Sequence, residues 1–151
     1  MNPDKAKPAK RRGDRQLTAL AGEFFVAAEL TKRGLQTSVT FGNAKSIDLL
    51  AYNPTTKRTF AVQVKSLRSA NFFLIGHSDI EQHAIYVFVL LNRVNEAVQY
   101  FVVSGEELYA EPGRFSHWFT APKMPGIHSN LLLELGYGDA WEVFEELEEG
   151  G

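Results

Sequence analysis

The sequence predicts an α/β domain in which helices flank a central mixed β-sheet. The N-terminal third carries a long helical pattern, and short runs with strand spacing follow it. Residues 84–91 form a continuous apolar run, which is typical of a central strand covered on both faces. The 151 residues are 44% hydrophobic and contain no repeat or internal linker, so a single domain with its own core is expected.

The first helix is predicted over residues 14–33, with Asp14 as its N-cap and Gly34 as its stop. Its apolar residues recur at helical spacing and are expected to face the core: Leu17, Leu20, Phe24, Ala27 or Ala28, and Leu30.

Six segments after this helix are predicted to be strands: residues 36–41, 47–52, 59–66, 72–75, 84–91 and 97–103. Ser104 and Glu107 have the spacing of a capping box, which predicts a short helix. The segment 111–130 is rich in proline and glycine, so it is expected to be mostly loop, and 131–135 is ambiguous.

A terminal helix is predicted over residues 140–147, anchored by Trp141, Phe144 and Leu147. Six aromatic residues at strand spacing are expected in the core: Phe72, Phe73, Tyr86, Phe88, Tyr100 and Phe101. The environment of Trp118 and Phe119 stays open, and these two could face a partner.

Charge is unevenly distributed, although the net charge is only −2. Residues 1–13 form a basic arm that is expected to be disordered, either binding phosphates or acting as a solubilising tail. The chain has no cysteine, which excludes disulfides, thiolate metal sites and cysteine nucleophiles. With no apolar run of about 20 residues, a soluble cytoplasmic protein without a membrane partner is expected.

The most informative pattern is the predicted hairpin of residues 47–52 and 59–66. Side chains alternate along a strand, so Gln63 and Lys65 should point away from the apolar Val62 and Val64. A turn centred between residues 55 and 56 would place Asp48 opposite Gln63.

Asp48 lies between two apolar neighbours, and a buried carboxylate needs a partner. One possibility is a structural ion pair with Lys65. The other is a divalent cation held by Asp48, the Gln63 side-chain carbonyl and a backbone carbonyl near Val64, because Mg²⁺ prefers oxygen ligands. The residues alone leave both possibilities open.

The runs 47–51 (IDLLA) and 61–66 (AVQVKS) resemble the PD-(D/E)XK, or restriction-endonuclease-like, nuclease superfamily. The run 22–30 (GEFFVAAEL) resembles the first helix of Holliday-junction resolvases in that superfamily. The resemblance implies one nuclease-like domain over residues 14–151. It matches Glu23 to the helix acid, Asp48 to the motif aspartate, Gln63 to the Asp/Glu position and Lys65 to the motif lysine.

Two departures from the superfamily pattern matter. No proline precedes Asp48, and Gln63 replaces an acid, as in a Q-x-K version that resembles type IV restriction nucleases acting on modified DNA. The loss of one negative charge should weaken affinity for a metal.

The resemblance implies an endonuclease that cleaves DNA with Mg²⁺ or Mn²⁺, and cutting of both strands would favour a homodimer. Asp48 and Gln63, aided by Glu23, would hold the metal, and Lys65 would orient water or stabilise charge on the phosphate. Lys45, Ser66 and Arg68 flank the site and are candidates for phosphate contacts. The alternatives are a non-catalytic module of the same fold, which Gln63 favours, and a structural protein with an Asp48–Lys65 ion pair.

Overall fold

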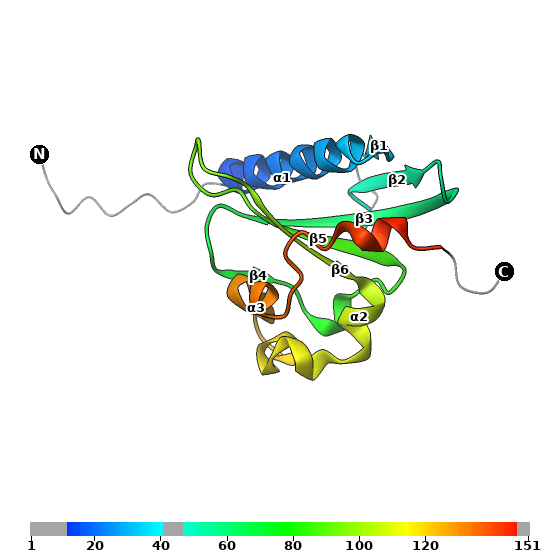
Figure 1. The fold of residues 1–151 in the computed structure, drawn as a ribbon. Coiled ribbons are helices and arrows are strands. Elements are labelled where there is room, and N and C mark those ends of the chain that lie inside the picture. Colours follow the sequence, from blue (N-terminus) through cyan, green and yellow to red (C-terminus); the bar gives the residue numbers. More distant parts are fainter. Residues whose placement is uncertain (1–11, 41–46, 148–151) are drawn as a thin grey trace, which may run out of the picture.

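Five strands form the central sheet in the order β1-β2-β3-β5-β6 (Figure 1). Their bounds are β1 Gln36–Val39, β2 Leu49–Asn53, β3 Arg58–Leu67, β5 Ala84–Leu90 and β6 Gln99–Ser104. In this computed structural model, which describes residues 12–40 and 47–147, β3 and β5 pair in parallel and the other neighbours pair antiparallel. The predicted mixed sheet is therefore confirmed.

The strand at residues 72–75 does not join this sheet. It is β4 (Phe72–Leu74), and it pairs with β7 (Gly126–His128) in a separate two-stranded sheet. β7 lies in the segment predicted to be mostly loop, which also contains two 3-10 helices, η2 (Pro112–Phe115) and η3 (His117–Thr120). Phe73 and Ile127 face each other in this pair and are buried. These buried contacts stabilise the two short strands. The contacts join distant segments, so the local sequence does not predict them.

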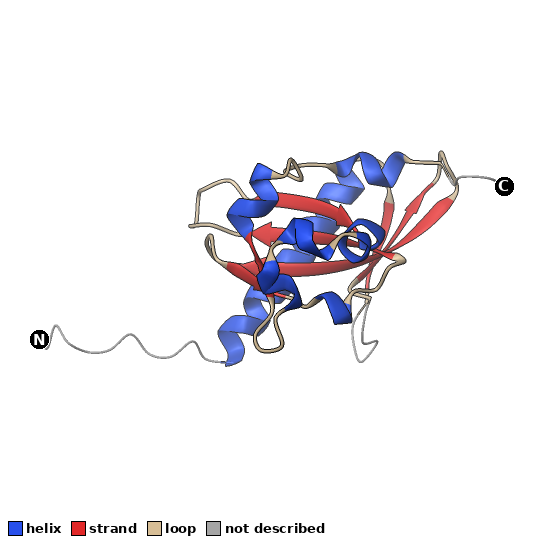
Figure 2. Cartoon of the chain, turned by 90° about the horizontal axis from the view of Figure 1, so that it is seen from below, coloured by secondary structure: helices blue, strands red, loops and turns tan. Residues whose placement is uncertain are grey.

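Each face of the central sheet has its own hydrophobic core. Helix α1 (Arg12–Lys32) and the 3-10 helix η4 (Trp141–Glu145) contribute to the core on one face. On the other face, α2 (Gly105–Ala110), α3 (Ser129–Glu134), η2, η3 and the small sheet cover β5 and β6. Seen from that side, the short helices lie over the strands (Figure 2). The predicted central position of β5 is confirmed, because all seven of its residues are buried.

Helix α1 keeps the predicted Leu30 and the partly buried Ala27 in the core, but its N-terminal half packs on a different face from the one predicted. Val26 and Leu30 are fully buried, and Thr18 and Gly22 continue the same stripe at four-residue spacing. The predicted core residues Leu17, Leu20 and Phe24 are instead 61%, 37% and 50% exposed. The small residues of the buried stripe let the helix approach the sheet closely, which apolar spacing alone did not reveal.

The observed ends of α1 agree in part with the predicted ends. The helix begins at Arg12, so Asp14 lies in its first turn and is not the N-cap. Gly34 has φ +95°, and the amides of Gly34 and Leu35 bond to the carbonyls of Thr31 and Leu30, as in a Schellman stop. Within the described residues, no helix has the length and apolar character required to cross a bilayer.

The second helix begins as predicted. The Ser104 hydroxyl accepts a hydrogen bond from the Glu107 amide at 3.1 Å. The Glu107 carboxylate accepts a hydrogen bond from the Tyr137 hydroxyl at 2.8 Å, and no reciprocal capping-box bond to Ser104 is among the described contacts. Glu107 therefore ties α2 to the segment after α3.

Two expectations about apolar residues need correction. The terminal element is the 3-10 helix η4, in which Trp141 and Phe144 are buried while Leu147, beyond its end, is 73% exposed. Five of the six predicted core aromatics are buried, but Phe72 is 38% exposed on the edge of β4. Phe72 therefore belongs to the surface described below.

The orientation of α1 predicts opposite outcomes for two leucine truncations. Leu30→Ala should cost about 2–5 kcal/mol of unfolding free energy, because the side chain is fully buried. Leu17→Ala should change it by no more than about 0.5 kcal/mol, because Leu17 is exposed. Urea unfolding of both variants measures the difference. Equal losses would contradict this orientation.

Candidate active site

The β2–β3 hairpin is fixed by Asn53, which is buried at its turn. Its side-chain oxygen accepts hydrogen bonds from the amides of Thr55 and Thr56, at 2.9 and 3.3 Å. Its side-chain nitrogen donates to the carbonyl of Phe144 at 2.9 Å, which joins the turn to η4. Asn53 pairs with Arg58, as the predicted register requires, and the ladder runs back to the Leu49–Val62 pair.

Asp48 lies immediately before β2, at the point where the ladder with β3 ends. Its amide donates to the Val62 carbonyl at 3.0 Å, and its carbonyl accepts from the Thr40 amide at 2.9 Å. Its carboxylate accepts a hydrogen bond from the Val64 amide at 2.8 Å. Amides of a strand point along the sheet plane, so the carboxylate occupies the place where β2 would otherwise continue. The position is thus held by three backbone contacts.

Glu23 reaches this place because α1 approaches β3 closely at the preceding residue. A β-carbon added to Gly22 would lie 1.7 Å from the Ser66 hydroxyl oxygen and 2.8 Å from the Ser66 β-carbon. A glycine is therefore required for this contact. The expectation that Gly22 permits close approach is confirmed.

The carboxyl groups of Glu23 and Asp48 lie side by side. Burial raises the pKa of Glu23 above its ordinary value, and the negative charge of Asp48 and a hydrogen bond between the two side chains raise it further. A hydrogen bond between two carboxyl groups requires that one of them hold a proton. The pair therefore favours a bound proton or a cation over two bare negative charges.

Gln63 and Lys65 are half-buried and alternate with the buried Val62 and Val64 on β3, as predicted. They point to the sheet face opposite α1, whereas the Asp48 carboxylate lies in the sheet plane against the peptide that joins Gln63 to Val64. Among the described residues, the ion pairs within 4.0 Å are Arg33–Glu29 and Arg93–Glu96. The alternative of a direct Asp48–Lys65 ion pair is therefore wrong.

The three flanking candidates have different placements. Lys45 lies outside the described residues. The Ser66 hydroxyl is buried against Gly22 without a hydrogen-bond partner, so it is not placed to contact a phosphate. Arg68 follows β3 and lines a cleft beside the site. Of the two candidates that the structure describes, Arg68 is the one whose charged side chain lines the cleft.

This cleft has a volume of about 720 Å³ and lies between the first turns of α1, the end of β3, β4 and η3; we call it the β4 cleft. Six of its lining residues carry the chemistry considered below: Arg15, Lys65, Arg68, Asn71, Phe72 and Trp118. Sequence reasoning missed Arg15, Asn71 and Phe72, because tertiary packing alone brings them to Lys65. Of the two residues whose environment the sequence leaves open, Trp118 is 50% exposed and Phe119 is fully buried.

The oxygen donors around Asp48 fit a hard divalent cation. Glu23 and Asp48 supply two adjacent carboxylates, and Gln63 and the β3 backbone bring carbonyl oxygens to the same strand segment. No cluster of three or more acidic, histidine or cysteine side chains able to hold a metal occurs in residues 12–40 and 47–147. The third protein ligand would therefore be an amide or backbone oxygen.

No protein-family model matches the chain, and a search of curated proteins finds no similar sequence. The resemblance to the PD-(D/E)XK superfamily therefore rests on the motif residues themselves.

The Glu23–Asp48 pair predicts a pH dependence of stability. The folded chain holds the Glu23 proton at pH values where the unfolded chain has released it, so unfolding free energy should fall as pH rises through the raised pKa. Glu23→Gln, which has no proton to lose, should flatten this decline at pH values above 4.5, the ordinary pKa of the glutamate carboxyl, in metal-free urea unfolding. Glu29→Gln, on the same helix, is the control and should keep the wild-type slope. An unchanged slope in Glu23→Gln would contradict the pairing.

Proposed function

We propose that the chain is a metal-dependent DNA endonuclease of the PD-(D/E)XK type. The observation that carries the proposal is the adjacency of the Glu23 and Asp48 carboxyls at the start of β2. The strand against which Asp48 bonds also carries Gln63 and Lys65. Two acids, an amide and an ammonium in this order and spacing support the resemblance on which the proposal rests.

In the proposed site, Glu23, Asp48 and the Gln63 carbonyl would hold Mg²⁺ or Mn²⁺. When bound, such a cation supplies Lewis-acid polarisation of a phosphate oxygen and lowers the pKa of a bound water. Asp48 is held by its backbone contacts, so its carboxylate needs little reorganisation on ligand binding. Lys65 places a positive charge on the same strand, where it orients water or stabilises charge on phosphate.

The basic residues next to this site support DNA as the substrate. Arg15 and Arg68 line the β4 cleft together with Lys65. Arginine and lysine provide most contacts to the nucleic-acid backbone, which fix position without reading sequence. DNA bound along these residues would carry a phosphate close to Asp48.

Cleavage is tested with supercoiled and branched DNA in Mg²⁺ or Mn²⁺. Asp48→Ala should abolish cleavage, because it removes the central ligand, and Lys65→Ala should slow it by about 10²–10³-fold. Lys32→Ala, at the far end of α1, is the matched control and should cleave as the wild type does. Equal cleavage by Asp48→Ala, Lys65→Ala and wild type would exclude this active site.

A second candidate is a non-catalytic module of the same fold that binds nucleic acid or protein. Among residues 12–40 and 47–147 the site has two acids, with Gln63 at the third position, and this favours the module. Titration calorimetry with Mg²⁺ and Mn²⁺ separates the candidates. The endonuclease should bind the metal, Asp48→Ala should lose that binding, and Gln63→Glu should keep or strengthen it. A wild type that binds DNA but neither metal would support the module.

The proposal includes a cytoplasmic location, which the absence of cysteine supports. It also includes a homodimer, because cleavage of both strands by one site per chain needs two copies. Leu17, Leu20 and Phe24 of α1 are exposed apolar residues, and they support a contact between the two copies.

A further inference from the structure

The β4 cleft combines an aromatic wall with a basic rim. Phe72 and Trp118 come from β4 and η3, and their ring centroids lie 6.4 Å apart at an interplanar angle of 76°. Phe72 is 38% and Trp118 is 50% exposed, so both rings keep open surface. Large aromatic groups exposed together in a concave site are a common sign of ligand binding.

The geometry of this wall suits a flat ligand. Phe72 also makes a perpendicular ring contact with His128, with ring centroids 4.8 Å apart. The Phe72 amide also bonds to the side-chain oxygen of Asn71 at 2.8 Å. This bond holds the Asn71 side chain at the cleft and leaves its amide nitrogen available as a donor. The cleft volume of about 720 Å³ falls within the range of small-ligand sites.

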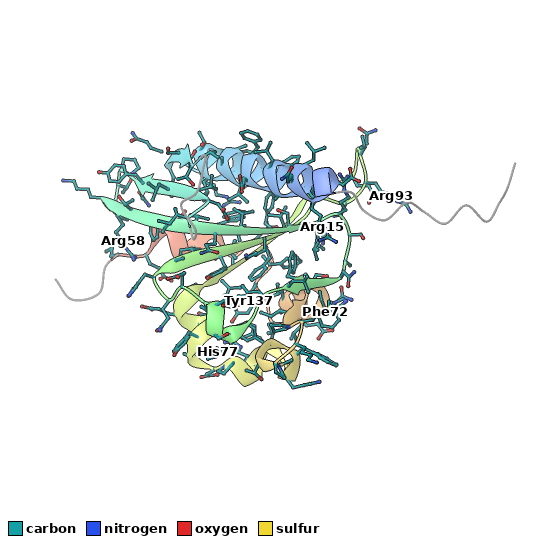
Figure 3. All side chains as sticks on the ribbon, turned by 180° about the vertical axis from the view of Figure 1, so that it is seen from behind. Arg15, Arg58, Phe72, His77, Arg93 and Tyr137 are labelled. Carbon is teal, nitrogen blue, oxygen red and sulfur yellow. The ribbon has the colours of Figure 1, made fainter. Side chains whose placement is uncertain are left out.

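The charges around the cleft favour an anion. Arg15, Lys65 and Arg68 line it, and Asp14 is the acid among the described lining residues. Arg15 lies on α1 and Phe72 on β4, at the same end of the molecule (Figure 3). The cleft therefore places cations of α1 and β3 around aromatic rings of β4 and η3.

We propose that the β4 cleft binds one unstacked nucleotide of single-stranded DNA, with the base against Trp118 and Phe72 and its phosphates at Arg15 and Arg68. Base stacking on aromatic rings, combined with a basic groove, is the general chemistry of single-strand binding. A duplex keeps its bases stacked and cannot present one to the rings. Inorganic phosphate, the simpler alternative ligand, would contact the basic residues but not the two aromatic rings.

The inference deepens the proposed endonuclease and rests on it for the identity of the substrate. Lys65 lines the cleft, and Gln63 precedes it by two residues on β3, so the cleft begins about 7 Å from the proposed metal site. A nucleotide held there would place a neighbouring phosphodiester at Asp48. The substrate class is therefore DNA with a single-stranded or unpaired segment, such as a branch or a flap.

The test measures binding in EDTA, where metal-dependent cleavage does not interfere. Oligodeoxythymidylate, oligodeoxyadenylate and the duplex of the two are titrated against the full chain, and labelled oligonucleotides report affinity by anisotropy. Both single strands should bind more tightly than the duplex. Trp118→Ala should weaken single-strand affinity by about 5-fold to about 150-fold, which corresponds to the loss of one stacked base.

Two further variants test the stacking directly. Trp118→Phe should restore most of the affinity, because a phenyl ring still offers a face for the base. In a Trp141→Phe background, Trp118 is the remaining tryptophan, and its fluorescence should be quenched by single strands but not by the duplex. Trp141 is buried in the opposite core, and its loss should leave the affinity measured by anisotropy unchanged.

Controls separate stacking from phosphate contacts. Tyr109→Ala removes a 43% exposed aromatic on α2 that does not line the cleft, and it should leave affinity unchanged. Arg68→Gln should reduce the slope of the logarithm of affinity against the logarithm of salt concentration by about 0.7. An RNA oligonucleotide of matched length that binds more tightly than DNA would overturn the DNA assignment.

The outcomes distinguish this inference from the proposed function. Trp118→Ala that binds single strands as tightly as wild type, or a duplex that binds as tightly as either strand, overturns the nucleotide site even if DNA is cleaved. Trp118-dependent binding without cleavage by the wild type supports the nucleotide site and refutes the endonuclease. If the protein binds no oligonucleotide at all, the inference is overturned, and the remaining candidate ligand of the cleft is a protein partner.

Discussion

The candidate site depends on one hydrogen bond, from the Val64 amide to the Asp48 carboxylate, 2.8 Å long. The bond forms just before the start of β2, where β3 continues beyond its last pair with β2. The carboxylate of Asp48 there takes the place of a backbone carbonyl of β2 as the acceptor. The carboxylate therefore lies in the sheet plane, against the backbone of the strand that carries Gln63 and Lys65. Gly22 then lets α1 approach β3, and Glu23 is brought to the same carboxylate.

Much of this arrangement was predictable because it is local. The strand pattern of residues 59–66 and the turn residues after Asn53 were sufficient for the hairpin register, which the Asn53–Arg58 and Leu49–Val62 pairs confirm. The same register predicted Asp48 directly opposite Gln63, but the ladder ends at the Leu49–Val62 pair and the Asp48 carboxylate bonds to the Val64 amide instead. Alternation along β3 correctly separated Gln63 and Lys65 from the buried valines. These inferences use only neighbouring residues and fixed strand geometry.

The rest required tertiary information. The apolar spacing of α1 indicated a stripe through Leu17 and Phe24, but close packing against Ser66 selects the stripe through Gly22 and Val26. The pairing of β4 with β7 joins segments more than fifty residues apart, and it creates the β4 cleft. Local periodicity determines neither which face of α1 is buried nor which distant strands pair. The same packing buries the Ser66 hydroxyl that the motif placed near phosphate.

The most direct test of the central claim is a crystal structure of the protein soaked in Mn²⁺, with anomalous scattering recorded at the manganese edge. One strong anomalous peak is expected between the carboxylates of Glu23 and Asp48, within coordinating distance of an oxygen from Gln63 or the β3 backbone. The peak should vanish in Asp48→Ala crystals soaked in the same way. Wild-type crystals without a peak at this place, in which the two acids remain side by side and share a proton, would contradict a metal-dependent active site.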